Sequence, residues 1–289
     1  MIADQRLEYF CGDGTPLVFA HANGYPAASY RRFLNRMPEH YEVYGYSHRP
    51  LWNDKSEPVA PIRANWSVFA QDLVDTLRQW TREPVWMMGH SLGAVVSLLA
   101  VVREPSLFRG LILIDPVFVP MRQALLMKLT PSALLRRTPL IRKTLGRPAR
   151  FDNVQAAFDF HRGKRVFTRF SDEALWDYIY AGTRTVARDD TKGDRGCDDA
   201  VELVWSPEWE AAVYLSVPLV WPRLRRLQLP TLGLRGEDSD ILTAAALQRW
   251  QQLQPSAQLL TCAGGHLLPL EFPERSAAHV IDFLQRSGG

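Results

Sequence analysis

The sequence predicts an α/β protein in which a mostly parallel sheet, covered on both faces, is interrupted by an inserted helical cap. Short apolar runs alternate with amphipathic helical patterns over residues 1–116. Continuous apolar strands separated by helices are typical of a parallel sheet that is buried on both sides. The alternation stops over residues 117–225 and resumes over residues 226–289. We therefore expect a core in two parts and a cap at 117–225, lying over the carboxyl ends of the strands.

The individual elements follow from the spacing of apolar residues. In the first part of the core we expect strands at 17–20, 43–46, 85–88 and 111–114, and helices at 30–37, 66–80 and 92–102. In the second part we expect strands at 230–234 and 258–260, and helices at 244–253 and 274–285. The insertion shows helical patterns, for example at 173–181, and no clear strand pattern.

A candidate nucleophile lies where the strand at 85–88 meets the helix at 92–102. The five residues Gly89-His90-Ser91-Leu92-Gly93 form a Gly-x-Ser-x-Gly turn in this setting. Such a turn presents a serine hydroxyl above the sheet, and the flanking glycines leave room for the neighbouring strand and helix. The sequence therefore predicts Ser91 as a nucleophile, with the Leu92 amide as one donor to a developing oxyanion.

A hydroxyl needs a base, and the base needs an acid that fixes its tautomer. His266, preceded by two glycines in a loop between the last strand and the last helix, is the predicted base. Three carboxylates in Glu237-Asp238-Ser239-Asp240 follow the penultimate strand. We favour Asp240 as the acid and keep Asp238 as the alternative, because a loop beyond the strand end can reach back to the histidine. Asp115 is a third option, although it is also suited to turning the chain before a proline.

A second oxyanion donor is expected from the loop that follows the first predicted strand. This loop reads His21-Ala22-Asn23-Gly24-Tyr25-Pro26. Either Asn23 or Tyr25 can present its backbone amide, depending on how the loop is aligned, and we prefer Asn23. His21 and His90 are more often structural hydrogen-bonding residues at such positions than catalytic ones.

The order of these motifs resembles the α/β-hydrolase superfamily, specifically its cap-bearing serine hydrolases of the esterase and lipase type. The His-Ala-Asn-Gly loop, the Gly-His-Ser-Leu-Gly turn, the Gly-Glu-Asp-Ser-Asp loop and the Gly-Gly-His loop occur in family order. The resemblance implies an acyl-enzyme mechanism on a carboxylic ester, thioester or lactone. Hydrolysis of a carbon–carbon bond by the same residues, or ligand binding with little turnover, are the alternatives that it leaves open.

Composition excludes several other classes of function. A net charge of +3 is too small to indicate nucleic-acid binding, and no apolar run is long enough to span a bilayer. The sequence contains no metal-ligand cluster, phosphate-binding glycine loop or dinucleotide fingerprint, so we expect neither a metal nor another cofactor. Three widely spaced cysteines and an N-terminus without a signal-type apolar region predict a cytoplasmic protein.

The insertion carries the features that would select a small-molecule substrate. Its many aromatic residues indicate a largely apolar substrate group. Residues 116–151 hold eight Arg and Lys residues and neither Asp nor Glu. A solvated helix face is the more common role for such a run, but it also suits a substrate with an acidic group or weak peripheral contact with an anionic membrane.

Overall fold

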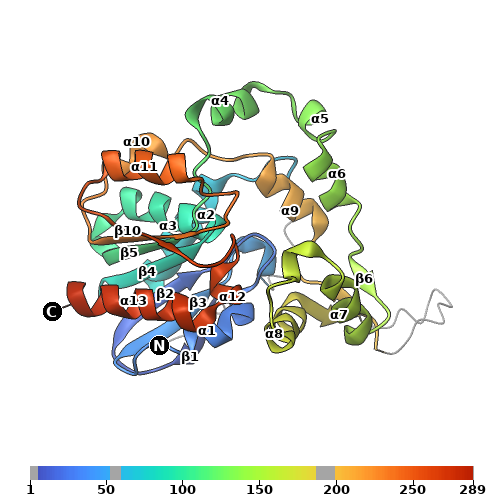
Figure 1. The fold of residues 1–289 in the computed structure, drawn as a ribbon, viewed down its shortest axis with the longest axis horizontal. Coiled ribbons are helices and arrows are strands. Elements are labelled where there is room, and N and C mark those ends of the chain that lie inside the picture. The colour runs from blue at the N-terminus through green and yellow to red at the C-terminus, as the bar shows by residue number, and fades with distance from the viewer. Residues whose placement is uncertain (1–5, 53–59, 187–198, 289) are drawn as a thin grey trace.

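A computed structural model describes residues 6–52, 60–186 and 199–288 of the 289-residue chain. Cys197 lies outside these ranges. A seven-stranded sheet, in the order β1-β3-β2-β4-β5-β9-β10, forms the centre of the molecule (Figure 1). Only β1 is antiparallel to its neighbour, and the other strands are parallel. The strands are β1 (Leu7–Cys11), β2 (Thr15–Ala20), β3 (Tyr41–Tyr46), β4 (Val85–His90), β5 (Phe108–Ile114), β9 (Thr231–Gly236) and β10 (Gln258–Cys262). The predicted mostly parallel sheet is confirmed.

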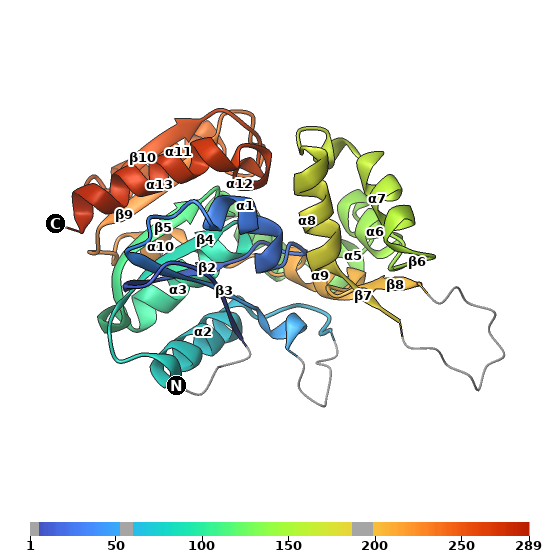
Figure 2. The same ribbon diagram turned by 90° about the horizontal axis from the view of Figure 1, so that it is seen from below.

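Helices cover both faces of the sheet, as the continuous apolar strands predict (Figure 2). One face carries α2 (Trp66–Trp80), α3 (Leu92–Arg103), α10 (Trp221–Leu224) and α11 (Ala244–Leu253); the other carries α1 (Arg31–Leu34), α12 (Leu268–Glu271) and α13 (Pro273–Ser287). Alternate residues of β4 enter the two cores, with Val85 and Met87 in one and Trp86 and Met88 in the other. Short 3-10 helices occur at η1 (Ala27–Tyr30), η2 (Arg49–Leu51) and η3 (Pro105–Leu107).

The chain between β5 and β9 leaves the sheet and forms a second body beside its carboxyl edge (Figures 1 and 2). It contains α4 (Met121–Leu129), α5 (Ser132–Leu135), α6 (Pro139–Leu145), α7 (Val154–Arg162), η4 (Arg165–Phe167), α8 (Asp172–Gly182) and α9 (Pro207–Tyr214), before α10 returns to the core. A small antiparallel sheet joins β6 (Arg150–Phe151), β8 (Val201–Leu203) and β7 (Thr183–Thr185). The sequence showed no strand pattern here because segments of two or three residues are too short to display a period.

None of the helices in the described ranges is long and apolar enough to cross a membrane. The sequence pattern also did not predict the edge strand β1. Its residues are all at least partly exposed and do not alternate between buried and exposed, and it pairs only with β3.

Candidate active site

The predicted nucleophile turn is built between β4 and α3. Ser91 has φ 55° and ψ −111°, in the left-handed half of backbone space, and its N–H donates to Ile114 O at 3.0 Å. A Cβ at Gly93 would lie 2.1 Å from Ala20 O, and one at Gly89 would lie 2.5 Å from the backbone of Gly93. Both flanking positions therefore require glycine, because α3 passes directly against the carboxyl end of the sheet.

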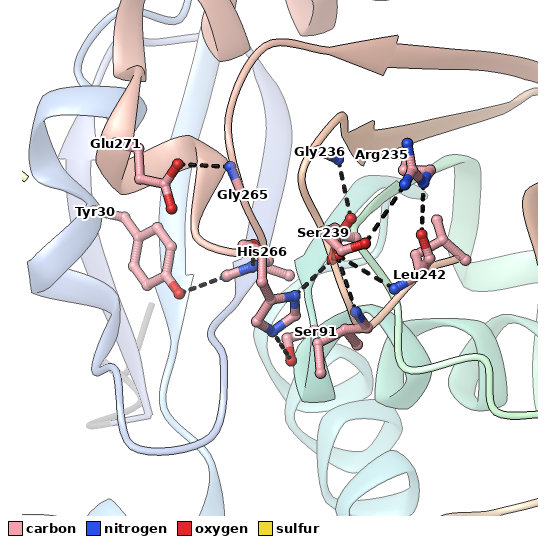
Figure 3. A network of polar contacts seen from close by, with 12 residues as sticks. Tyr30, Ser91, Arg235, Gly236, Ser239, Leu242, Gly265, His266 and Glu271 are labelled. Atoms are coloured by element: carbon pink, nitrogen blue, oxygen red, sulfur yellow. Dashed lines mark hydrogen bonds and ion pairs between the residues drawn. The ribbon is translucent and has the colours of Figure 1, made fainter. Parts of the chain in front are cut away.

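His266 contacts both the Ser91 hydroxyl and the Asp115 carboxylate. Its Nε2 lies 2.9 Å from Ser91 Oγ, and its Nδ1 lies 2.6 Å from Asp115 Oδ2 (Figure 3). An ionised carboxylate only accepts hydrogen bonds, so Nδ1 carries the proton. Nε2 is then free to accept the hydrogen of the Ser91 hydroxyl, which is the arrangement required for proton removal from a serine nucleophile.

Asp115 is fully buried at the end of β5, in a site built for a carboxylate. Besides His266, it accepts hydrogen bonds from the Gly236 N–H at 3.0 Å and the Ser239 hydroxyl at 2.5 Å. Its φ is 41°, and Ser91 and Asp115 are the only non-glycine residues with positive φ in the described part of the chain. Strained backbone is thus confined to the two residues that flank the imidazole, as is common at functional sites.

The contact with Asp115 corrects the expectation that the acid comes from the loop after β9. Asp240 is exposed to solvent. Asp238 is also exposed, and it pairs with Arg169 of the inserted segment at 2.6 Å. Because β5 lies between β4 and β9 in the sheet, its carboxyl end is nearer to Ser91 than the loop after β9.

Ser239 is a site residue that the sequence reasoning missed. It is buried, unlike Asp238 and Asp240 on either side of it. Its Oγ accepts hydrogen bonds from the backbone amides of Ile241 and Leu242, which leaves its proton for Asp115 (Figure 3). The loop after β9 thus contributes a hydroxyl to the site, and its acids face outward.

A second buried network fixes the backbone of the histidine loop. His90 Nε2 donates to His266 O at 2.8 Å, because a carbonyl oxygen can only accept. His90 Nδ1 then accepts from the Tyr30 hydroxyl at 2.7 Å. Burial lowers the pKa of His90 well below its usual value, so the ring is neutral and can make both contacts. The residue before Ser91 therefore has the structural role expected of it, through a contact with His266.

The loop after β2 begins beside the nucleophile turn, since Ala20 pairs with Gly89 of β4. The Tyr25 amide donates to Ala22 O at 3.2 Å and is therefore already engaged. Asn23 is buried; its side-chain Nδ2 donates to Glu210 O at 3.2 Å. Leu92 is the first residue of α3, where a helix leaves its amide N–H groups without intrahelical partners.

His21 of the same loop makes its hydrogen bonds with residues other than Ser91 and His266. Its Nδ1 donates to Ala22 O at 2.8 Å, and its Nε2 accepts from the His48 amide at 3.3 Å. Burial lowers the pKa of His21 to about 4. These contacts agree with the structural role expected for it.

A cavity of about 590 Å³ adjoins the loop after β2, between that loop and the inserted segment. Asn23 and Tyr25 line it from the core, and α6, η4 and α9 line it from the insertion. Just beyond η4, Arg169 contacts Glu271 at 3.6 Å, and Glu271 accepts from the Gly265 amide at 2.6 Å. The inserted segment thus reaches the loop that carries His266 as well as the loop after β2.

Comparisons with known proteins agree with this architecture. The sequence profile described as the alpha/beta hydrolase family matches residues 17–279. A monoglyceride lipase of Rattus norvegicus is 30% identical over 118 residues, which are 38% of this chain and 39% of the lipase. The chain therefore matches less than half the length of that relative.

Solved structures that resemble the whole chain include the following two. E-2-(acetamidomethylene)succinate hydrolase superposes with a TM-score of 0.75 at 23% identity, covering 96% of this chain and 94% of the other. A thioesterase domain from the curacin biosynthetic pathway superposes with a TM-score of 0.73 at 17% identity, covering 95% and 94%. At these sequence identities the two superpositions establish the fold alone. The family assignment comes from the match to the family profile over residues 17–279. The chain belongs to the alpha/beta hydrolase family.

Proposed function

We propose that this protein is a serine hydrolase that forms an acyl-enzyme on Ser91. Nε2 of His266 takes the Ser91 proton as Oγ attacks the substrate carbonyl carbon. Asp115 holds the other ring nitrogen and stabilises the imidazolium that forms. His266 then returns the proton to the leaving group as its bond to the carbonyl carbon breaks. In the second half, His266 activates a water that releases the acid and regenerates Ser91.

The negative charge on the carbonyl oxygen requires fixed donors. We assign these to the backbone amides of Leu92 and Asn23. The Leu92 amide follows the nucleophile directly at the positive end of α3. Asn23 is favoured over Tyr25 because the Tyr25 amide already donates to Ala22 O.

The observation that carries the proposal is the unbroken chain of hydrogen bonds from Ser91 through His266 to Asp115. A structural serine at a helix start would need neither a partly buried imidazole partner nor a buried carboxylate behind it. We further propose that residues 117–225 act as a cap and that 1–116 and 226–289 form the catalytic core. This division is supported by the position of the insertion between neighbouring strands β5 and β9.

The substrate class that we propose is a carboxylic ester, thioester or lactone with a largely apolar group. The monoglyceride lipase and the thioesterase domain described above are similar proteins whose names fit this class. The cavity beside the loop after β2 includes Phe160, Phe167 and Tyr214 in its wall, which supports an apolar contact surface. Carbon–carbon bond hydrolysis uses the same residues and is tested by including a diketone in the substrate panel.

The charges that line the same cavity favour a substrate with an acidic group. Four cationic side chains line it, and Glu210 is the only carboxylate among its described lining residues. Glu210 pairs with Arg147 at 2.6 Å, which leaves Lys143, Lys164 and Arg165 as further positive charges around the cavity. A net positive cavity favours anionic substrates. Esters with a terminal carboxylate should show a lower KM than neutral esters of equal length, and Lys164→Gln should reduce this difference.

The decisive experiment combines covalent labelling with turnover. A fluorophosphonate probe should label wild-type protein at Ser91, and Ser91→Ala should abolish labelling. The same pair should differ by several orders of magnitude in hydrolysis of p-nitrophenyl esters. Wild-type activity no greater than that of Ser91→Ala would reject the mechanism and would favour a binding protein with little turnover.

We also propose a cytoplasmic location. Cys11 and Cys262, the cysteines within the described ranges, are free thiols. Free thiols are typical of proteins from reducing compartments. Alkylation of the protein in intact cells, followed by mass spectrometry, tests this point.

A further inference from the structure

Exposed leucines are concentrated on three consecutive helices of the insertion. We call residues 121–143, which contain α4, α5 and the start of α6, the basic arm. Ten large hydrophobic side chains are exposed in the described part of the chain, and the basic arm carries half of them. These are Leu125, Leu126, Leu129, Leu134 and Leu140, with Leu129 80% and Leu126 66% exposed. Apolar exposure on this scale within about 20 residues marks an interaction surface.

Ile141 anchors the end of the basic arm on Ala211 and Leu215, while α4 and α5 are held by polar contacts that leave the five leucines named above exposed. Arg63, from the loop before α2, donates to Met127 O at 3.2 Å and to Ser132 Oγ at 2.8 Å, and it also contacts Thr130 O. Ala124 is the only buried residue of α4, and α5 has none. In Figure 1, α4 and α5 lie on the outer edge of the molecule, away from the central sheet.

The charge on the basic arm has one sign. Its exposed cations are Arg122, Lys128, Arg136, Arg137, Arg142 and Lys143. Neither Asp nor Glu occurs between residues 116 and 151. Exposed leucines can enter the acyl boundary of a bilayer, and the cations beside them on these short helices are attracted to anionic headgroups.

We propose that the basic arm docks on an anionic phospholipid bilayer, with its leucines in the acyl boundary and its cations among the headgroups. A second copy of this chain fits the surface poorly, because a two-fold contact would place each cationic cluster against its own counterpart. A bilayer accepts apolar side chains from several short helices without a matching rigid surface. The inference does not depend on the proposed catalytic function, although Leu140 and Lys143 at the end of the basic arm also line the cavity proposed for the substrate.

The test measures binding without turnover. Wild-type protein is sedimented with vesicles of phosphatidylcholine alone and of phosphatidylcholine mixed with phosphatidylglycerol. We expect at least roughly tenfold stronger partitioning into the mixed vesicles, decreasing with added salt. The double variant Arg136→Gln/Arg137→Gln should lose most of this preference, since each cation near an anionic leaflet contributes about fivefold.

Matched variants distinguish docking through the basic arm from general effects of net charge or surface hydrophobicity on vesicle binding. Arg225→Gln/Arg226→Gln removes an equally exposed arginine pair that follows α10 and should leave vesicle binding unchanged. Leu126→Ser/Leu129→Ser should lower partitioning at least roughly tenfold while circular dichroism stays as in wild type, because exposed side chains contribute little to folding.

Equal binding to both vesicle types, or equal loss in the two arginine pairs, would overturn the proposal. A concentration-dependent dimer that the leucine variant abolishes would also overturn it and would assign the surface to self-association.

Discussion

Replacing Asp115 by Asn is the sharpest test of the catalytic assignment. The amide oxygen can take the place of Oδ1 and accept from the Gly236 amide, so the amide nitrogen would take the place of Oδ2 and face His266 and the Ser239 hydroxyl. His266 Nδ1 would then accept a hydrogen bond instead of donating one, and the ring proton would move to Nε2. In that tautomer the imidazole cannot take the proton of Ser91.

The expected loss is about 10⁴-fold in kcat, the size seen when a triad acid becomes an amide. At about 1.36 kcal/mol per tenfold, this corresponds to roughly 5 kcal/mol of transition-state stabilisation. The protein should still fold, because Asn tolerates the positive φ that Asp115 adopts here. The assay is hydrolysis of a p-nitrophenyl ester at pH 7, with thermal unfolding as the control for folding.

Asp240→Asn and Asp238→Asn serve as matched controls. Both carboxylates are exposed and contact neither Ser91 nor His266 in the structure, so each variant should keep kcat within about twofold of wild type. A large loss in Asp240→Asn together with a small loss in Asp115→Asn would refute the assignment of Asp115.

Three further predictions concern the support of the site and the stability of the fold. Ser239→Ala removes a charge-assisted hydrogen bond and should lower kcat about tenfold in the same ester assay, with KM little changed. Gly93→Ala places a Cβ 2.1 Å from Ala20 O and should lower the free energy of unfolding by more than about 2 kcal/mol in urea, whereas Gly163→Ala, whose nearest contact is 3.7 Å, should change it by less than about 1 kcal/mol. Burial lowers the pKa of His161 to about 4, so the unfolded chain binds a proton that the folded protein does not, and stability should decrease as pH falls from about 6.5 to about 4. Denaturation curves across this range should show a shallower decrease in a His161→Gln variant.

The sequence predicts the nucleophile and the base because each depends on local chain geometry. Ser91 lies in a turn whose glycines are required by close backbone contacts, and those glycines are visible in the sequence. His266 follows two glycines between a strand and a helix. The structure places the Ser91 hydroxyl and His266 Nε2 2.9 Å apart, at hydrogen-bond distance. The central sheet was predictable for a similar reason, since its strands are continuous apolar runs.

The acid was harder to predict because it depends on the order of strands in the sheet. Asp115 is far from His266 in sequence, and its own neighbourhood, Ile114-Asp115-Pro116, also fits an ordinary turn. Nothing local shows that β5 lies between β4 and β9. The cluster of acids after β9 was the stronger sequence signal, yet it faces solvent and, through Asp238, the inserted segment.

Ser239, the buried serine in that cluster, shows how the ends of β5 and β9 together form one site. Ile114 of β5 pairs with Leu234 of β9, so both strands end at the same edge of the sheet, next to His266. The end of β5 supplies the Asp115 carboxylate. The end of β9 and the loop after it supply the Gly236 amide and the Ser239 hydroxyl that bind this carboxylate. A buried carboxylate needs hydrogen-bond donors, because an unpaired polar group is costly to remove from water. The loop after β9 therefore contributes to the site by binding Asp115, although its own acids point away from the histidine.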